Sequence, residues 1–239
     1  MAHRDADQPR ATIRNATKAD TMEVGRLFVA TDEPIFERAF GPAAALGRYL
    51  EGTFDEGGIL APDTVRVAVL GDEVVGICVS YAKDYPSCHG MSFTRRLESG
   101  IDRLSEAFDD TMSDQMQDIR MATDMGFAYI DCLCVDEGHR GQGIGRALLD
   151  DALLLHGSSM LYCREDNEVA LSLYKGMGFR MMGMTFGISE DEESLGPVML
   201  MLAIAVTEGE RGAERTPFEP AEEPDDPRQG NRMPVTPRK

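Results

Sequence analysis

The chain reads AYIDCLCVDEGHRGQGIG from residue 128 to residue 145, and this stretch decides the fold. Its first part, 128–135, alternates in polarity as a half-buried strand does. The period of two predicts one face with Tyr129, Asp131, Leu133 and Val135 and another with Ile130, Cys132 and Cys134. A turn at 136–139 leads into the glycine-rich run 140–145, and helical spacing follows over 147–155.

A glycine-rich run between a strand and a helix is typical of an anion-binding loop. Glycines let the backbone approach a phosphate closely, and the N–H groups of a helix N-terminus attract its charge. A Walker loop is excluded, because Arg146 and Ala147 stand where Lys and Ser or Thr are required. A dinucleotide fingerprint fits poorly, because the third glycine, Gly145, comes one position early. A glycine-rich turn without a ligand remains as the plain alternative.

A second pattern lies further along the chain, where residues 167–179 read NEVALSLYKGMGF. The spacing predicts a helix over 168–177, ended by Gly178. Asn167 and Tyr174 are seven residues apart, about two helical turns, and so lie on the same side of this segment.

Together these two stretches resemble the GNAT superfamily of acyl-CoA N-acyltransferases. The run 140–145 is similar to the Arg/Gln-x-x-Gly-x-Gly/Ala signature, and 167–179 resembles the Asn-x-x-Ala-x-x-Leu-Tyr-x-x-x-Gly-Phe hallmark. The resemblance is strong over 129–186 and only general over 11–81. It implies an α/β fold of the α+β type: a central mixed, mostly antiparallel twisted sheet of six to seven strands flanked by helices, with a helical insertion between strands three and four.

The residue patterns place the other elements around this centre. Strands are expected at 11–14, 65–70, 74–81, 159–163, 180–186 and 198–204, and helices at 17–31 and 43–52. We expect a flexible leader at 1–10, an N-acetyltransferase domain over 11–206 with a helical insertion at 82–126, and a disordered, Pro-rich acidic tail at 207–239. The tail holds six of the twelve prolines and little apolar surface to bury.

The resemblance implies acetyl-CoA as co-substrate and transfer of the acetyl group to a primary amine by direct attack. No metal is expected, because none of the four His stands at metal-ligand spacing to another His or Cys. The residues expected to bind the cofactor are Leu133, Cys134, Val135, Arg140, Gly141, Gln142, Gly143, Ile144, Gly145, Arg146 and Asn167. Two other functions stay open: a non-catalytic acyl-CoA-binding or interaction module, and an acyltransferase that uses a longer acyl-CoA.

Two catalytic residues are expected. Tyr174 is the candidate general acid, because a phenol can protonate a departing thiolate; alternatively it only packs or bonds to the cofactor sulfur. Asp131 is the candidate base or anchor for a cationic acceptor, and a structural carboxylate is its alternative. Glu33 and Glu37 are further acidic residues that could face the acceptor. The sulfur-containing residues expected in the core are Cys132, Cys134, Met181, Met182, Met184, Met199 and Met201.

Composition limits the partners. The formal net charge is −18, from 24 basic and 42 acidic residues, which argues against nucleic acid or an anionic membrane and mildly favours a cationic small-molecule or peptide amine. No apolar stretch reaches membrane-spanning length, and no export signal is evident. The five cysteines form no CxxC pair, so a reducing, cytoplasmic setting is expected. The resemblance leaves room for a homodimer, since dimers are common in the family.

Overall fold

The computed structural model describes residues 10–31, 36–37, 41–56, 60–82, 119, 121–186 and 197–203. Within them seven strands form one sheet in the order β1-β2-β3-β4-β5-β7-β6. The strands are β1 Thr12–Asn15, β2 Val65–Leu70, β3 Glu73–Tyr81, β4 Ala128–Val135, β5 Ser159–Arg164, β6 Arg180–Phe186 and β7 Pro197–Ala203. All neighbours are antiparallel except β4 and β5. The predicted mixed, mostly antiparallel sheet is confirmed.

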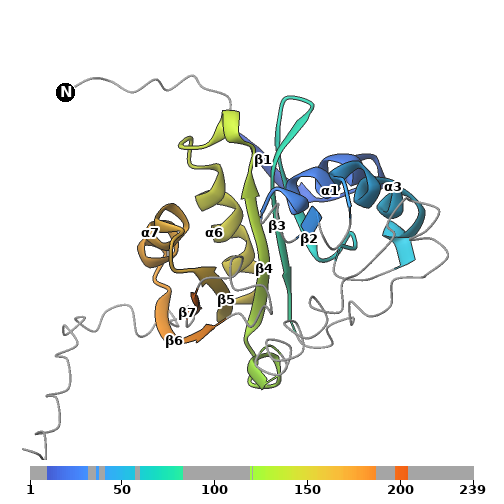
Figure 1. Ribbon diagram of the computed structural model, residues 1–239. Coiled ribbons are helices and arrows are strands. Elements are labelled where there is room, and N and C mark those ends of the chain that lie inside the picture. The colour runs from blue at the N-terminus through green and yellow to red at the C-terminus, as the bar shows by residue number, and fades with distance from the viewer. Residues whose placement is uncertain are drawn as a thin grey trace, which may run out of the picture. The chain divides into compact units, whose positions relative to one another are not determined.

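Helices cover both faces of this sheet. The described helices are η1 Lys18–Asp20, α1 Thr21–Val29, α3 Ala43–Thr53, η2 Phe54–Glu56, η4 Glu137–His139, α6 Ile144–His156 and α7 Glu168–Gly176. Figure 1 shows α1 and α3 on one side of the sheet and α6 and α7 on the other. Helix α6 begins at Ile144, earlier than its predicted start at Ala147, and its N-cap residue Gly143 has the left-handed φ of 83°.

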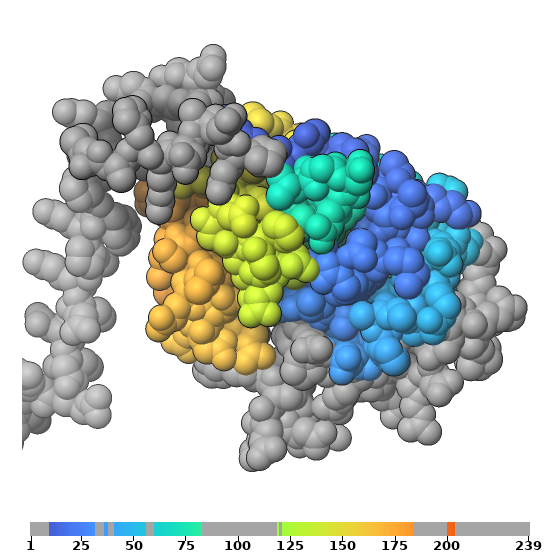
Figure 2. Space-filling model, turned by 90° about the horizontal axis from the view of Figure 1, so that it is seen from above, coloured from blue at the N-terminus to red at the C-terminus, as the bar shows by residue number. Residues whose placement is uncertain are grey.

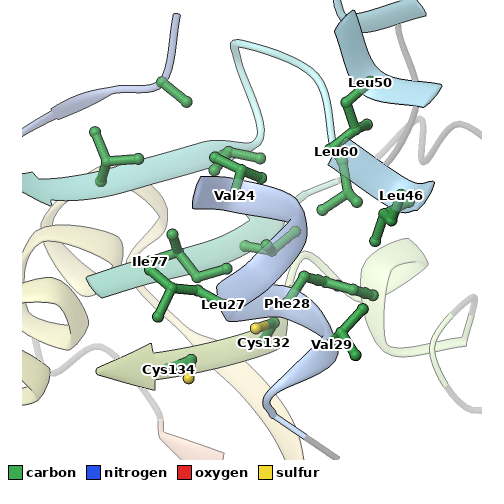
Figure 3. Packing of buried hydrophobic residues seen from close by; sticks show 14 of the residues in the cluster. Val24, Leu27, Phe28, Val29, Leu46, Leu50, Leu60, Ile77, Cys132 and Cys134 are labelled. Atoms are coloured by element: carbon green, nitrogen blue, oxygen red, sulfur yellow. The ribbon is translucent and has the colours of Figure 1, made fainter. Parts of the chain in front are cut away.

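One hydrophobic cluster joins α1 and α3 to the sheet, and we call it the α1/α3 cluster. Val24, Leu27 and Phe28 of α1 are buried in it, and Figure 3 shows them over β3 and β4. The two helices meet at a pair of glycines. A Cβ atom added to Gly25 would lie 2.6 Å from the backbone nitrogen of Gly47, so neither helix could approach the other with a side chain there.

The opposite face carries the second cluster, which we call the α6/α7 cluster. Its buried members include Leu148 and Leu149 of α6, Leu171 and Tyr174 of α7, and Cys163 of β5. Apolar side chains on one stripe of each helix thus cover the second face of the sheet. The sheet is the middle layer between two separate cores.

A β-bulge interrupts β4 at Asp131. The pairing with β3 runs from Cys132 opposite Val79 directly to Ile130 opposite Ser80, so Asp131 is an extra residue without a partner. An extra residue exchanges the two faces of the strand from that point on.

The predicted faces of β4 are therefore wrong on one side of the bulge. Tyr129 packs in the α1/α3 cluster with Cys132 and Cys134, while Ile130 packs in the α6/α7 cluster, against which Leu133 and Val135 also lie. The prediction placed Tyr129 with Leu133, and Ile130 with the cysteines. An alternation argument has no means of detecting one inserted residue. The expected burial of Cys132 and Cys134 in the core is confirmed.

The strands β4 and β5 pair only at their beginnings. Parallel pairing joins Ala128–Ile130 to Ser159–Leu161, although β4 continues to Val135 and β5 to Arg164. From Asp131 onward the two strands diverge. We call the space between residues 131–135 and 162–164 the fork, and the bulge lies at its apex.

The predictions about the core methionines are confirmed in part, and those about the ends of the chain fall largely on residues that the structure does not describe. Met201 is buried as expected, but Met181 and Met182 of β6 are 56% and 63% exposed, because β6 is the edge strand of the sheet. The side chains of Met184 and Met199 lie outside the described residues. Nearly all of the predicted leader, the whole predicted tail and residues 83–118 of the predicted insertion also lie outside the described residues. Near the end of the predicted insertion, residues 121–124 are helical.

Candidate active site

The glycine-rich run forms an open loop at the start of α6. Gly141 and Gly143 have φ of 76° and 83°, values that suit glycine, and a Cβ added to either would find no atom within 4 Å. Residues 140–143 are all exposed. Figure 2 looks onto this end of the sheet, where lime-green atoms from the end of β4 onward lie between the orange region around α7 and the blue region around α1.

The loop presents N–H groups that the helix itself does not use. The first backbone bond of α6 runs from the Ala147 N–H to the Gly143 carbonyl, so the N–H groups of Ile144, Gly145 and Arg146 have no partner within the helix. These groups and the positive end of the helix dipole suit a phosphate. A side chain at Gly141 or Gly143 would occupy the open space beside these N–H groups.

Charged and polar side chains of the loop lie around this opening. Arg140 Nε donates to the Val135 carbonyl at 3.1 Å, which holds its guanidinium beside the end of β4. Gln142 Nε2 donates to the Gly138 carbonyl at 3.5 Å. Arg146 Nη2 donates to the carbonyl of Gly176, at the end of α7, at 3.4 Å. The loop therefore has two arginines close to its N–H groups.

The end of β4 offers backbone groups to the fork. The Asp136 N–H donates to the Val75 carbonyl of β3 at 2.9 Å, and alternate residues of an antiparallel strand point the same way. Cys134 thus directs its backbone groups toward β3, whereas Leu133 and Val135 direct theirs away from β3, into the fork. Of the three predicted β4 contacts, the geometry brings Leu133 and Val135 to the fork and leaves Cys134 out.

Tyr174 lies in α7, beside the fork. Its side chain is buried in the α6/α7 cluster together with Cys163, and its ring packs on Phe179 with centroids 5.8 Å apart. Burial, with a smaller contribution from Cys163, raises the pKa of the phenol well above its usual range. The hydroxyl accordingly keeps its proton at neutral pH and can only donate it to a strong base.

Asp131 lies at the apex of the fork. Its carboxyl makes no hydrogen bond or ion pair with the described residues, and burial alone raises its pKa to about 7. A carboxylate that is half ionised near neutral pH is suited to proton exchange. The alternative of a carboxylate held by structural hydrogen bonds has no support in the described part of the chain.

Asn167 caps the N-terminus of α7. Its Oδ1 accepts from the Ala170 N–H at 3.1 Å. Its Nδ2 group has no hydrogen-bond partner in the described ranges, so the contact to a cofactor arm stays a prediction. Of the two further acidic candidates, Glu37 is exposed and Glu33 lies outside the described residues.

An ion pair that no sequence pattern indicated holds the turn before the loop. Arg26 Nη1 of α1 lies 2.9 Å from Asp136 Oδ2, and Asp136 Oδ1 accepts from the Gly138 N–H at 3.1 Å. These bonds hold the pKa of Asp136 below its usual value. They fix α1 against the end of β4. No local pattern could reveal a contact between residues so far apart in the sequence.

The described thiols are unsuited to nucleophilic catalysis. Burial raises the pKa of Cys163 to about 11 and that of Cys78 to about 12, so both are protonated at neutral pH. Within the described ranges no three His, Cys, Asp or Glu side chains gather as a metal site would require. Among the described helices none has the length and apolarity needed to cross a bilayer.

Comparison of the sequence with known families gives one match that covers these elements. The family model described as the acetyltransferase (GNAT) family matches residues 35–179, more than half of the chain. The chain belongs to this family. The GNAT match ends at Phe179, the last residue of the second motif, and includes the fork, the loop and Tyr174.

Curated relatives match over short stretches. The chain is 40% identical over 55 residues to the peptidyl-lysine N-acetyltransferase YjaB of Salmonella typhimurium, a match to 23% of this chain and 38% of that one. It is 40% identical over 52 residues to the N-alpha-acetyltransferase RimI of Mycobacterium tuberculosis, covering 21% and 33%. The chain spans between 17% and 38% of the length of the curated relatives it matches.

Solved structures support the fold. An N-acetyltransferase from Staphylococcus aureus Mu50 aligns with a TM-score of 0.55 at 18% identity, over 81% of this chain and 100% of that one. At this identity the likeness shows a GNAT fold, and it carries nothing about the acceptor.

Proposed function

We propose that this GNAT chain is an acetyl-CoA-dependent N-acetyltransferase that transfers an acetyl group from the thioester to a primary amine. The observation that supports this most is the fork. It combines the end of β4 beyond its pairing with β5, where Leu133 and Val135 direct their N–H groups into the fork, the open glycine-rich loop that follows β4, and a protonated Tyr174 in the α6/α7 cluster. The co-substrate, when bound, supplies an activated carbonyl carbon and a thiolate leaving group.

Different residues of the chain would bind different parts of acetyl-CoA. The N–H groups of residues 144–146, with Arg140 and Arg146 nearby, would hold the pyrophosphate. Leu133 and Val135 would bond the pantetheine arm as an added strand. An N–H group near Val135 would also stabilise the oxygen of the thioester carbonyl as negative charge develops on it. The loop glycines leave the room that this placement requires.

Two side chains would move the protons. Asp131 takes a proton from the ammonium form of the acceptor, which frees the nitrogen lone pair to attack the carbonyl carbon. A carbon–nitrogen bond forms and the carbon–sulfur bond breaks. The attacking nitrogen loses its second proton to solvent as the amide forms, and Asp131 later releases its proton to solvent as well. Tyr174 gives its proton to the departing sulfur and regains one from solvent. The sum is an amide, a thiol and one proton released.

The acceptor class rests on the relatives and on charge. One relative is named for peptidyl lysine and another for α-amines, so a peptide amine or a small-molecule amine is the proposed acceptor. The net charge of −18 favours a cation. The described cysteines are free and buried, as in a reducing compartment, and we propose that the enzyme acts in the cytoplasm.

The proposal is tested by thiol release. Purified protein is mixed with acetyl-CoA and a panel of primary amines, and free thiol is measured over time for the wild type and for Tyr174→Phe. We expect amine-dependent release, with kcat lowered about 100-fold or more in Tyr174→Phe and an unchanged dissociation constant for acetyl-CoA.

Three results would count against parts of this proposal. Binding of acetyl-CoA without thiol release for any amine would favour the non-catalytic acyl-CoA-binding module. Release only with a longer acyl-CoA would keep the transferase but change the donor. Equal kcat in Tyr174→Phe and the wild type would remove Tyr174 as the acid.

A further inference from the structure

The glycine-rich loop begins just after the point where the pairing of β4 ends. Val135 still pairs with Gly76 of β3, and the Asp136 N–H donates to the Val75 carbonyl at 2.9 Å. Residues 137–143 take no part in the sheet. The placement of the loop relative to β4 therefore depends on the turn at 136–139, which contains the short helix η4.

The side chain of Asp136 caps this turn. Its Oδ1 accepts from the Gly138 N–H at 3.1 Å, and its backbone carbonyl accepts from the His139 N–H at 2.9 Å. The Nδ1 of His139 lies 3.5 Å from the same Oδ1. A carboxylate that accepts N–H bonds at the start of a helical turn stabilises that turn. Asp136 thus fixes the direction in which the chain leaves β4.

Residues of the loop are bonded to this turn. The Arg140 N–H donates to the Glu137 carbonyl at 3.3 Å, and Gln142 Nε2 donates to the Gly138 carbonyl at 3.5 Å. The glycine between them, Gly141, has no side chain and lies in open space. Bonds to the turn therefore position the first half of the loop.

Arg26 reaches the same turn from the opposite layer of the molecule. Figure 1 shows α1 on one side of the sheet and α6, which follows the loop, on the other. Arg26 Nη1 lies 2.9 Å from Asp136 Oδ2, while Oδ1 of that carboxyl receives the bond from the turn. Arg26 Nε lies 2.7 Å from Glu23 Oε2, one turn earlier in α1. One carboxyl thus joins α1 to the turn before the loop.

We propose that Arg26 is a positioning residue for acetyl-CoA: by holding Asp136 it keeps the turn, and with it the loop, in the arrangement that binds the pyrophosphate. The inference rests on the proposed N-acetyltransferase function. Arg26 acts through Asp136 and is assigned no contact with the co-substrate or the acceptor.

This role concerns binding rather than the chemical step. Leu133 and Val135 lie on β4 where pairing with Cys78 and Gly76 of β3 holds the strand without help from Arg26. The loop comes after that pairing. Without Arg26 the loop should be less ordered before binding, and the binding of the pyrophosphate would then also have to order it. The fork itself should keep its geometry.

The expected effect is moderate, because the ion pair is in contact with water. The side chains of Arg26 and Asp136 are 41% and 25% exposed. Ion pairs between partly exposed groups are weakened by solvent and contribute little to the stability of a fold. A change in affinity with little change in stability is therefore what distinguishes positioning of the loop from support of the fold.

The test is calorimetric titration of acetyl-CoA and of free coenzyme A into a set of variants. Arg26→Gln, Asp136→Asn and the double variant form a cycle, and Arg26→Lys keeps the positive charge. Glu23→Gln is the matched control, because it removes the other partner of Arg26 and leaves the ion pair with Asp136. Arg14→Gln is a second control, since it breaks the ion pair with Asp20 on β1, the edge strand of the sheet.

We expect Arg26→Gln to weaken the binding of both ligands by about three- to tenfold, because both carry the pyrophosphate. The double variant should bind no more weakly than Asp136→Asn, since both changes break one interaction. Arg26→Lys should bind more tightly than Arg26→Gln, and both controls should stay within about twofold of the wild type. In thiol release, Arg26→Gln should raise KM for acetyl-CoA and leave kcat at saturation within about twofold.

Three results would overturn the positioning role while the enzyme function stands. They are wild-type affinity in Arg26→Gln, equal losses in Arg26→Gln and Glu23→Gln, and a double variant whose loss is the product of the two single losses. A lowered kcat with an unchanged KM would also overturn it, because Arg26 would then act on the chemical step. Failure of the wild type to bind acetyl-CoA would instead contradict the proposed N-acetyltransferase function.

Discussion

Asp131 shows how one inserted residue changes the chemistry of a strand. As the extra residue of the bulge it has no partner on β3, and it stands where β4 leaves β5. Burial raises its pKa to about 7, whereas an exposed aspartate titrates near 3.8. The sequence identified Asp131 as a candidate base, but its isolation arises from pairing with β3 and could not be predicted from β4 alone.

The first prediction at this scale concerns rate and pH. A base must be ionised to act, so kcat/KM for the amine should rise as pH passes through about 7 in the wild type. Asp131→Asn should lower the plateau about 100-fold and remove this limb of the profile. Steady-state thiol release between pH 5.5 and 9 measures both. A profile in Asp131→Asn with the same limb as the wild type would assign the titration to another group.

The second prediction concerns stability and pH. The folded pKa of Asp131 lies above its unfolded value, so the folded state binds the extra proton between about pH 4 and 7 and loses that advantage as pH rises. Asp131→Asn cannot ionise. Its free energy of unfolding relative to the wild type should therefore increase by about 2–3 kcal/mol between pH 5 and pH 8. Urea denaturation at the two pH values tests this, and a difference that does not change with pH contradicts the raised pKa.

At the scale of elements, local patterns predicted most helices and strands to within a few residues. The glycine-rich run between a strand and a helix is such a local signal, and it appears in the structure between β4 and α6. The contact of α1 with α3 was not predictable in this way. It depends on Gly25 and Gly47 meeting across two helices, and a single glycine within a helix carries no information about its partner.

The glycine contact gives a prediction of its own. A Cβ at Gly25 would lie 2.6 Å from the nitrogen of Gly47, so Gly25→Ala must push α1 and α3 apart. We expect a loss of about 2 kcal/mol or more in the free energy of unfolding, although alanine favours helix. Gly176→Ala at the end of α7 is the matched control, because its Cβ would meet no atom within 4 Å. Equal stability of the two variants in urea denaturation would show that the helices do not meet closely at Gly25.

At the scale of the whole molecule, the sheet carries the glycine-rich loop and Tyr174 on its α6/α7 side and, on its α1/α3 side, a row of tyrosines: Tyr81, Tyr129 and Tyr162. The motifs identified the loop glycines and Tyr174 as candidates, because the residues of each motif are close in sequence; their roles stay predictions. The ion pair between Arg26 and Asp136 and the tyrosine row could not be predicted, since they join distant segments.

The central claim is that the fork and the loop bind acetyl-CoA, and calorimetric titration of acetyl-CoA tests it most directly. The wild type is compared with Gly143→Val and Gly71→Val, which place a side chain at two glycines of similar positive φ, 83° and 64°, that have no atom within 4 Å of an added Cβ. Both variants carry the same backbone strain, but only Gly143 lies in the loop. The account predicts micromolar binding in the wild type and Gly71→Val, and binding at least about tenfold weaker in Gly143→Val. Equal binding in all three, or no binding in the wild type, would contradict it.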